Sequence, residues 1–138
     1  MADVFTKAKR SWIMSRVRSK DTVPERIVRS FLHRRGFRFS LNKRGLPGTP
    51  DIVLARHRAV VFVHSCFFHG HPGCKRATVP ATNRAFWARK IRRNRDRDAD
   101  AARALRRLGW RVVVVWECQA KRPATLERRL ARALAAFD

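Results

Sequence analysis

The feature that most constrains the fold is the segment VVFVHSCFFHGHPGC, residues 60–74. It begins as an apolar strand and then places three histidines, two cysteines and two adjacent phenylalanines within a few positions. Before it, the apolar runs DIVLA and AVVFVH are joined by the short polar RHR, a pattern that predicts a β-hairpin. We therefore expect a sheet. At its edge begins a loop over residues 65–80 that is rich in reactive side chains.

Further helix and strand signals flank this hairpin. Thr22 and Glu25 form a capping-box pattern that predicts the start of a helix, and Gly36 is placed to end it. Alternating apolar residues predict a strand over 37–41, before the turn-rich NKRGLPGTP. A long helix is expected over 82–108, followed by a buried strand in RVVVVWE and a closing amphipathic helix in PATLERRLARALAAF.

The order helix, three strands, helix, strand, helix predicts an α/β fold with a mixed sheet flanked by helices. The long helix would cross over from the third strand to the fourth on one face of the sheet. This order of elements resembles the core of restriction-endonuclease-like nucleases. We expect a single domain over 21–138, preceded by a basic arm over 1–20 that orders on its target.

The long helix carries polar residues on its apolar face. Spacings of three and four trace a stripe through Trp87, Ile91, Asn94, Asp98, Ala101, Leu105 and Leu108. A polar side chain that faces a core needs a partner or a function. Asn94 and Asp98 are therefore candidates for a site.

The charge of the chain points to a polyanionic partner. Lys and Arg number 33 against 10 Asp and Glu, a formal net charge of +23. Nucleic acid is the natural partner, because arginine forks match phosphate groups. An anionic membrane surface is the rival, but the basic residues are spread along the chain and no apolar run predicts a membrane span. Lacking a signal-peptide pattern, the chain is expected to be intracellular.

Asp51 and two histidines are candidates for catalysis. A lone aspartate at the start of a strand is more often a turn residue, and a histidine is more often structural. If the hairpin pairs as predicted, however, Asp51 meets His64 at one edge of the sheet, with His69 just beyond. A carboxylate that binds a metal, next to imidazoles that can move protons, would suit hydrolysis.

The cysteines and one histidine have spacings typical of a metal site. Cys66-x4-His71-x2-Cys74 lies in the loop, and Cys118 follows the last strand. Three thiolates and an imidazole can form a closed tetrahedral zinc site. The alternative is three scattered reduced cysteines; His69 or His64 could also replace His71 as the fourth ligand.

Phe67 and Phe68 stand between Cys66 and His69. Two adjacent rings on a polar loop cannot both point into one core, so one or both could be wedges between DNA bases. Trp87 could join them, although it also fits the helix stripe as a core residue.

Five ordered blocks resemble a known family. SxxMSRVRSKDTxPE, LPGTPDIV, VVFVHSCFFHGH.GC, VPATNRAFWARKIRRNRDRD and LGWRVVVVWEC are similar to the very-short-patch repair (Vsr) DNA mismatch endonucleases, over residues 11–118. The resemblance implies a restriction-endonuclease-like fold with a structural zinc. It also implies Mg²⁺-dependent nicking of double-stranded DNA on the 5′ side of the thymine in a T·G mismatch, which arises when 5-methylcytosine deaminates.

The resemblance also assigns roles to residues. It implies magnesium ligation by Asp51 and by the backbone carbonyl of Val63, and catalysis by His64, His69, Asp98 and Glu25. It implies zinc ligation by Cys66, His71, Cys74 and Cys118, and DNA contact by Met14, Phe67, Phe68 and Trp87. Two departures are that Phe68 stands where the family usually has Trp, and that HGHPGC is one residue longer than the family's more histidine-rich run.

The expected setting is the bacterial cytoplasm at the nucleoid, with the chain acting as a monomer alongside other mismatch-repair proteins. Two rival functions stay open from the sequence. One is a restriction-type endonuclease that cuts both strands, and the other is a non-catalytic zinc-containing DNA-binding protein.

Overall fold

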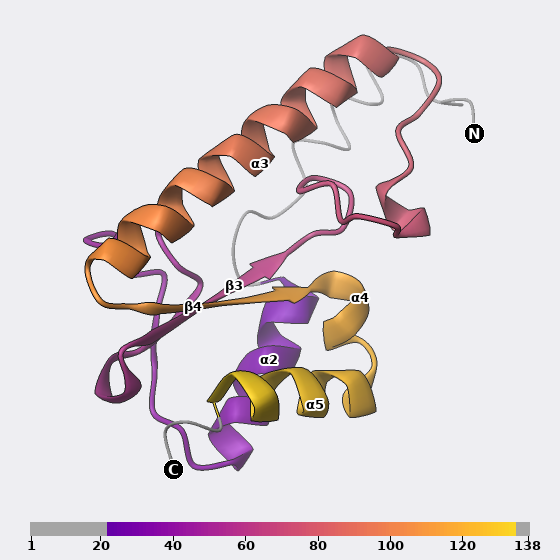
Figure 1. Cartoon of the computed structure of the whole chain (residues 1–138). Helices are drawn as coiled ribbons and strands as arrows, with labels where there is room; N and C mark the ends of the chain where they lie inside the picture. The colour runs from indigo at the N-terminus through magenta and orange to yellow at the C-terminus, as the bar shows by residue number, and fades with distance from the viewer. Residues whose placement is uncertain (1–21, 135–138) are drawn as a thin grey trace.

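The computed structural model describes residues 22–134; the basic arm predicted over 1–20, with Met14, lies outside them. The elements, in chain order (Figure 1), are α2 (Val23–Arg34), β1 (Ser40–Leu41), β2 (Ile52–Leu54), η1 (Ala55–His57), β3 (Ala59–His64), η2 (Lys75–Ala77), α3 (Arg84–Arg107), β4 (Arg111–Trp116), α4 (Glu117–Ala120) and α5 (Pro123–Leu134).

The four strands form one mixed sheet in the order β1-β2-β3-β4. β1 and β3 both pair antiparallel with β2, and β3 pairs parallel with β4, with α3 as the crossover between them. The predicted hairpin, crossover and mixed sheet are therefore confirmed. The predicted helix start is confirmed as well, because the Thr22 hydroxyl accepts a hydrogen bond from the Glu25 backbone N–H at 3.4 Å.

Three sequence predictions need correction. The strand predicted over 37–41 is only Ser40–Leu41, which pairs with Val53 and Ile52, whereas Phe37 and Phe39 pack against the core. The helix stripe does not reach Leu108, which caps α3 and is 54% exposed. The short helix α4, which directly follows β4, was not predicted.

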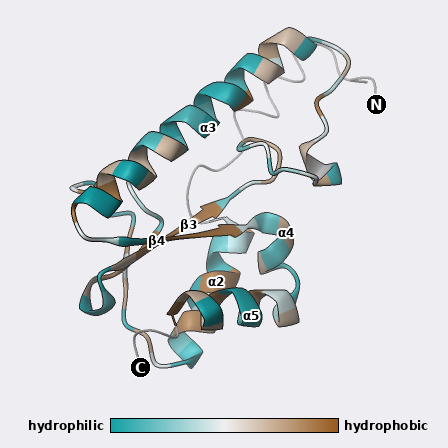
Figure 2. Ribbon diagram, in the orientation of Figure 1, coloured by the Kyte–Doolittle hydropathy of each residue, from teal (hydrophilic) through white to brown (hydrophobic). Residues whose placement is uncertain are grey.

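Helices cover both faces of the sheet. α2, α4 and α5 lie on one face, where their apolar side chains meet those of β2, β3 and β4 around Leu32, Val61 and Leu130. α3 lies on the other face, where Leu105 packs on Val53 and Val60. Apolar residues accordingly gather on the strands and on the inner sides of the helices (Figure 2). The sheet thus lies between two layers of helices, and the packing of Leu105 holds α3 on its face of the sheet.

The N-terminal half of α3 extends past the ends of β3 and β4, beside the loop that follows β3 (Figure 1). Gly70 brings loop and helix into contact: it has φ +62°, and a Cβ there would lie 2.6 Å from the Ile91 Cγ2. Only glycine fits this close approach without a shift of the helix. None of the helices in the part of the chain that the structure describes is long and apolar enough to cross a membrane.

Candidate active site and metal centre

Asp51 lies one residue before β2, opposite the end of β3. The hairpin register pairs Ile52 with Val61, so its continuation sets Pro50 opposite Val63. Proline has no N–H to give to a ladder. The Val63 N–H instead donates to the Asp51 Oδ2 at 2.7 Å. Because the N–H and C=O of a strand residue point to the same edge, the Val63 carbonyl also faces the Asp51 side.

The surroundings of Asp51 disfavour its charged form. Burial, the largest cause, and the nearby Glu25 carboxylate together raise its pKa from 3.8 to about 7, although the hydrogen bond from the Val63 N–H acts in the opposite direction. Glu25 projects from α2 and is 4% exposed. The helix-cap role of the Glu25 backbone and a role for its side chain beside Asp51 are thus compatible. A cation bound at Asp51 would remove the cost of ionising this carboxyl group.

His64 and His69 form a stacked pair next to Asp98. Their ring centroids lie 4.0 Å apart with an interplanar angle of 2°. The His69 Nδ1 and the Asp98 Oδ2 are 2.6 Å apart, and the His64 Nε2 lies 3.9 Å from the Asp98 Oδ1. Burial, with a smaller contribution from His69, lowers the pKa of His64 to about 4. His64 is therefore a neutral imidazole at neutral pH, whereas His69 is oriented by a carboxylate.

These groups share one cavity, of about 310 Å³. It is lined by Gly48, Thr49, Asp51, Phe62, Val63, His64, His69, Arg97, Asp98 and Ala101. Gly48 has φ +73°, and a Cβ there would lie 2.6 Å from the Ala101 Cβ, so the 43–50 turn closes tightly on α3. The predicted meeting of Asp51 with His64 at one sheet edge is borne out, and Asp98 has the partner that its place on the stripe required.

The four predicted zinc ligands also converge. One donor atom from each of Cys66, His71, Cys74 and Cys118 lies within 4.8 Å of all the others. Turns in the loop help to hold the set: the His71 N–H donates to the Cys66 carbonyl at 2.9 Å, and the Cys74 N–H to the His71 carbonyl at 3.3 Å. Cys118 comes from α4, and its Sγ is 3.5 Å from the His71 Nδ1.

The chemistry of this cluster suits zinc. Burial raises the pKa of the Cys66 thiol to about 12, with further contributions from Cys118 and Cys74. A buried thiolate is stable only next to a compensating cation. Three sulfurs and one imidazole nitrogen are a donor set for tetrahedral zinc. The residues present therefore fit a metal centre with four protein ligands.

One indole separates the two sites. The Trp116 ring stacks on His71 at 4.3 Å and meets His64 edge-on at 5.3 Å. Trp116 is the last residue of β4, and His64 is the last residue of β3. The ends of the two parallel strands thus support both the metal centre and the histidine pair.

The aromatic residues of the loop contact α3. Phe67 meets Phe68 at 5.2 Å and Trp87 at 5.3 Å between ring centroids. Trp87 is 4% exposed, in line with its place on the helix stripe, and its Nε1 has no hydrogen-bond partner among the described residues. Phe86, which the sequence analysis did not single out, extends this cluster at 5.1 Å from Trp87 and is 46% exposed.

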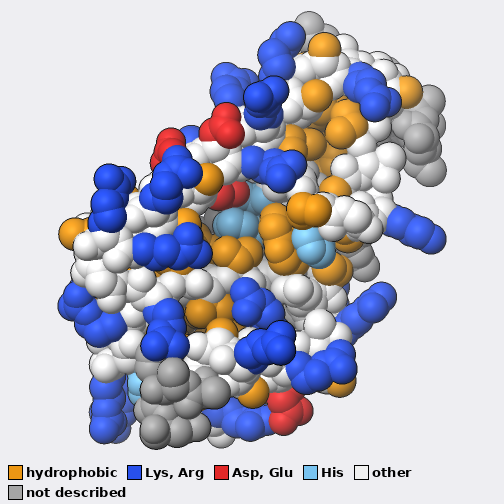
Figure 3. Space-filling view, in the orientation of Figure 1, with side chains coloured by type: hydrophobic (Ala, Val, Ile, Leu, Met, Phe, Trp, Pro, Cys, Tyr) orange, Lys and Arg blue, Asp and Glu red, His pale blue; other side chains and the backbone are white. Residues whose placement is uncertain are grey.

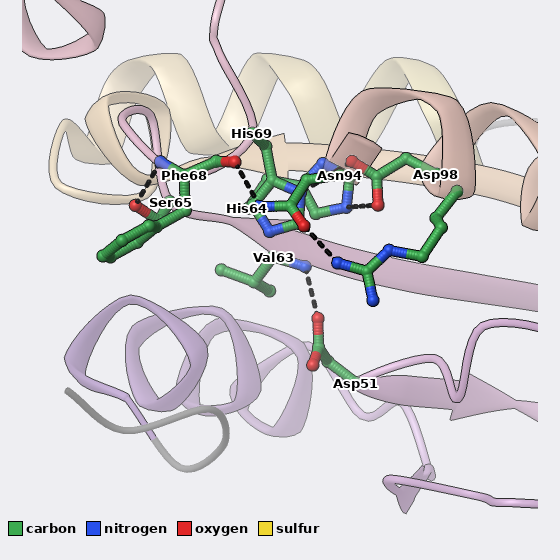
Figure 4. Close-up of polar contacts among 9 residues, drawn as sticks. Asp51, Val63, His64, Ser65, Phe68, His69, Asn94 and Asp98 are labelled. Carbon is green, nitrogen blue, oxygen red and sulfur yellow. Dashed lines mark hydrogen bonds and ion pairs between the residues drawn. The ribbon is translucent and has the colours of Figure 1, made fainter. Parts of the chain in front are cut away.

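Two more polar residues belong to the site. Asn94 donates from its Nδ2 to the Phe68 carbonyl at 2.8 Å, and its Oδ1 accepts a hydrogen bond from Arg97 (Figure 4). The stripe singled out Asn94, but nothing in the sequence separates Arg97 from the other arginines of α3. On the face in Figure 3, histidine and acidic side chains lie among Lys and Arg side chains.

Comparison with known proteins shows the family to which the chain belongs. The sequence model of the DNA mismatch endonuclease Vsr family matches residues 2–76. The DNA mismatch endonuclease Vsr of Escherichia coli (strain K12) is 44% identical over 118 residues, covering 86% of this chain and 75% of the relative. The chain belongs to the Vsr DNA mismatch endonuclease family. As a Vsr family member it is a DNA endonuclease, a hydrolase whose substrate is DNA.

Two type II nicking enzymes are similar to this Vsr family member over most of its length. V.XorIIP of Xanthomonas oryzae pv. oryzae is 48% identical over 130 residues, 94% of this chain and 95% of the relative. V.NmeAIP of Neisseria meningitidis is 44% identical over 132 residues, 96% of this chain and 94% of the relative. The predicted family and the prediction of an endonuclease are confirmed, and the rival function of a non-catalytic binding protein is excluded.

Proposed function

We propose that this Vsr family member nicks double-stranded DNA on the 5′ side of the thymine in a T·G mismatch, by Mg²⁺-dependent hydrolysis, and so starts very-short-patch repair. The observation that carries the proposal is the convergence of Asp51, His64, His69 and Asp98 in one cavity of a strongly basic DNA endonuclease. The family resemblance supports the T·G substrate.

In the proposed reaction, Asp51 and the Val63 carbonyl would hold magnesium, with Glu25 close to the Asp51 carboxylate. The bound ion would polarise the scissile phosphate and stabilise the leaving oxygen. Because burial, Glu25 and Asp98 all disfavour the anionic form of Asp51, binding of the ion would release the Asp51 proton.

His69 is the proposed general base. Its Nδ1 donates to the Asp98 carboxylate at 2.6 Å, which leaves Nε2 to accept a proton from the attacking water. Asp98 orients this ring and stabilises the imidazolium that forms. His64 is neutral and stacked on His69, so it can donate a hydrogen bond to the phosphate without adding a charge.

The proposal extends to the metal centre and the DNA contacts. Zinc bound by Cys66, His71, Cys74 and Cys118 would be structural, since four protein ligands leave no open position, and the fold would be restriction-endonuclease-like. Phe67 and Phe68, with Met14 from the arm, would wedge between bases next to the mismatch, and Trp87, which is buried, would support them from α3. The contacts of Phe67 with both other rings support a common role for these aromatics.

The decisive experiment is cleavage of matched duplexes that differ only in a T·G, T·A or C·G pair, in one sequence context with magnesium. We expect a nick in the thymine strand of the T·G duplex alone. Equal cleavage of all three duplexes would refute mismatch specificity. Linear rather than nicked plasmid would favour the restriction-type alternative, in which both strands are cut.

A further inference from the structure

The catalytic cavity contains a positive charge to which the proposed reaction gives no role. Arg97 projects from α3 and lines the cavity together with Asp51, His64 and His69. Among the described residues that line it, Arg97 is the one with a permanent positive charge. The Arg97 side chain is exposed, so its guanidinium is open to a ligand from solvent.

Arg97 is held by a neutral group. Its guanidinium donates to the Asn94 Oδ1, and the other end of that amide is fixed, because the Asn94 Nδ2 donates to the Phe68 carbonyl at 2.8 Å (Figure 4). Asn94 is only 9% exposed. An amide orients an arginine and leaves its positive charge uncompensated, whereas a carboxylate would neutralise that charge. Arg97 thus carries its charge into the cavity in a defined position.

The other charged groups in and beside the cavity are acidic, so a phosphate that binds there needs a positive partner. Asp51 and Asp98 are acidic, and Glu25 acts on Asp51 from α2. A phosphodiester that enters already carries one negative charge, and attack by water adds a second on the phosphate oxygens in the transition state. Carboxylates repel that charge, whereas a guanidinium fork pairs with two phosphate oxygens in a matched geometry.

We propose that Arg97 is a further catalytic residue, which binds non-bridging oxygens of the scissile phosphate, and that Asn94 is its positioning residue. This inference rests on the proposed hydrolytic site. Arg97 supplies charge and N–H donors, and it exchanges no proton in the step. Because Asn94 also holds the Phe68 carbonyl, the position of the aromatic loop and the position of Arg97 are linked through one amide.

The test is the single-turnover rate of nicking with the full chain, magnesium and saturating protein, so that affinity does not limit the rate. We expect Arg97→Ala to slow nicking by about 100-fold or more, because the variant loses an oriented donor to the charge of the transition state. Arg97→Lys should retain part of the wild-type rate. Arg93→Ala is the matched control, because Arg93 is exposed on the same helix but lies outside the cavity. Its nicking rate should stay within about threefold of the wild-type rate. Equal rates for Arg97→Ala and Arg93→Ala would overturn the proposal.

A double-mutant cycle tests the positioning role. Asn94→Ala should slow nicking in the wild-type background but change little in the Arg97→Ala background, because its effect passes through Arg97. Additive losses would show that Asn94 does not act through Arg97. Asp51→Ala distinguishes failure of this inference from failure of the proposed function. If Asp51→Ala still nicks DNA, the assignment of the hydrolytic site is wrong. If Asp51→Ala is inactive while Arg97→Ala keeps its rate, only the assignment of Arg97 fails.

Discussion

Replacement of Asp51 by asparagine should stabilise the fold when no magnesium is bound. Burial, reinforced by Glu25, raises the pKa of this carboxyl group from 3.8 to about 7. In the unfolded chain Asp51 ionises at a lower pH than in the folded protein. The stability that protonated Asp51 contributes is therefore fully present below pH 3.8 and is lost as the pH rises to about 7. A rise of about three pKa units corresponds to about 4 kcal/mol at high pH.

Asparagine keeps an oxygen that can accept the Val63 N–H and never ionises. Allowing for solvent screening of this half-buried group, we expect Asp51→Asn to raise the free energy of unfolding by about 1–4 kcal/mol at pH about 8. Less than half of that gain should remain at pH about 5, where folded Asp51 still holds its proton.

The assay is urea unfolding at both pH values without added magnesium and without a chelator, so that any zinc stays bound. Asp100→Asn serves as the control, because that carboxylate is exposed and paired with Arg103 on the surface of α3. Added magnesium should stabilise the wild type by mass action but not the Asp51 variant. A variant that is less stable than wild type at high pH, or a gain that does not grow with pH, would refute the reasoning.

Three further outcomes are expected. Cys118→Ala should lower zinc content and thermal stability together. Elemental analysis should find about one zinc per chain in the native protein, and zinc-free native protein with free thiols would contradict this prediction. His69→Ala should reduce nicking by on the order of 10²–10⁴-fold with DNA affinity kept, and Asp98→Asn should reduce it less; a parallel loss of binding in gel-shift assays would make both residues structural. Phe67→Ala should lower the preference for T·G over T·A duplexes more than it lowers salt-sensitive binding to ordinary duplex, which a binding series across salt concentrations measures. Full T·G preference in that variant would make the ring a packing residue of the loop.

Local sequence signals predicted the parts of the site that depend on strand order and helix period. The hairpin pattern set Asp51 against the end of β3, because antiparallel pairing of adjacent runs leaves little choice of register. The period of α3 singled out Asn94 and Asp98, because apolar neighbours on the same stripe fix which side faces the sheet. Ligand spacing likewise favoured the four residues that converge on a metal centre, although it left His64 and His69 open as alternatives to His71.

Other features depend on packing that no local pattern encodes. The approach of Glu25 to Asp51 requires the position of α2 against the sheet, which is set by the whole core around Val28 and Leu32. Arg97 is one arginine among many on α3, and only the fit of loop and helix shows which of them enters the cavity. The strand predicted over 37–41 was too long, because Phe37 and Phe39 pack against the core without pairing along β2.

The placement of the metal ligands also bears on the order in which the chain folds. Cys66, His71 and Cys74 are close in sequence, but Cys118 lies 47 residues after His71 and joins them only when β4 pairs in parallel with β3. Closing so long a connection is a slow step, since its entropy cost precedes the contacts that offset it. We therefore expect zinc to bind weakly to the three local ligands at first and tightly only when Cys118 arrives. In that order of events the bound ion would hold β4 against β3, and we expect nicking activity only in chains whose crossover is complete.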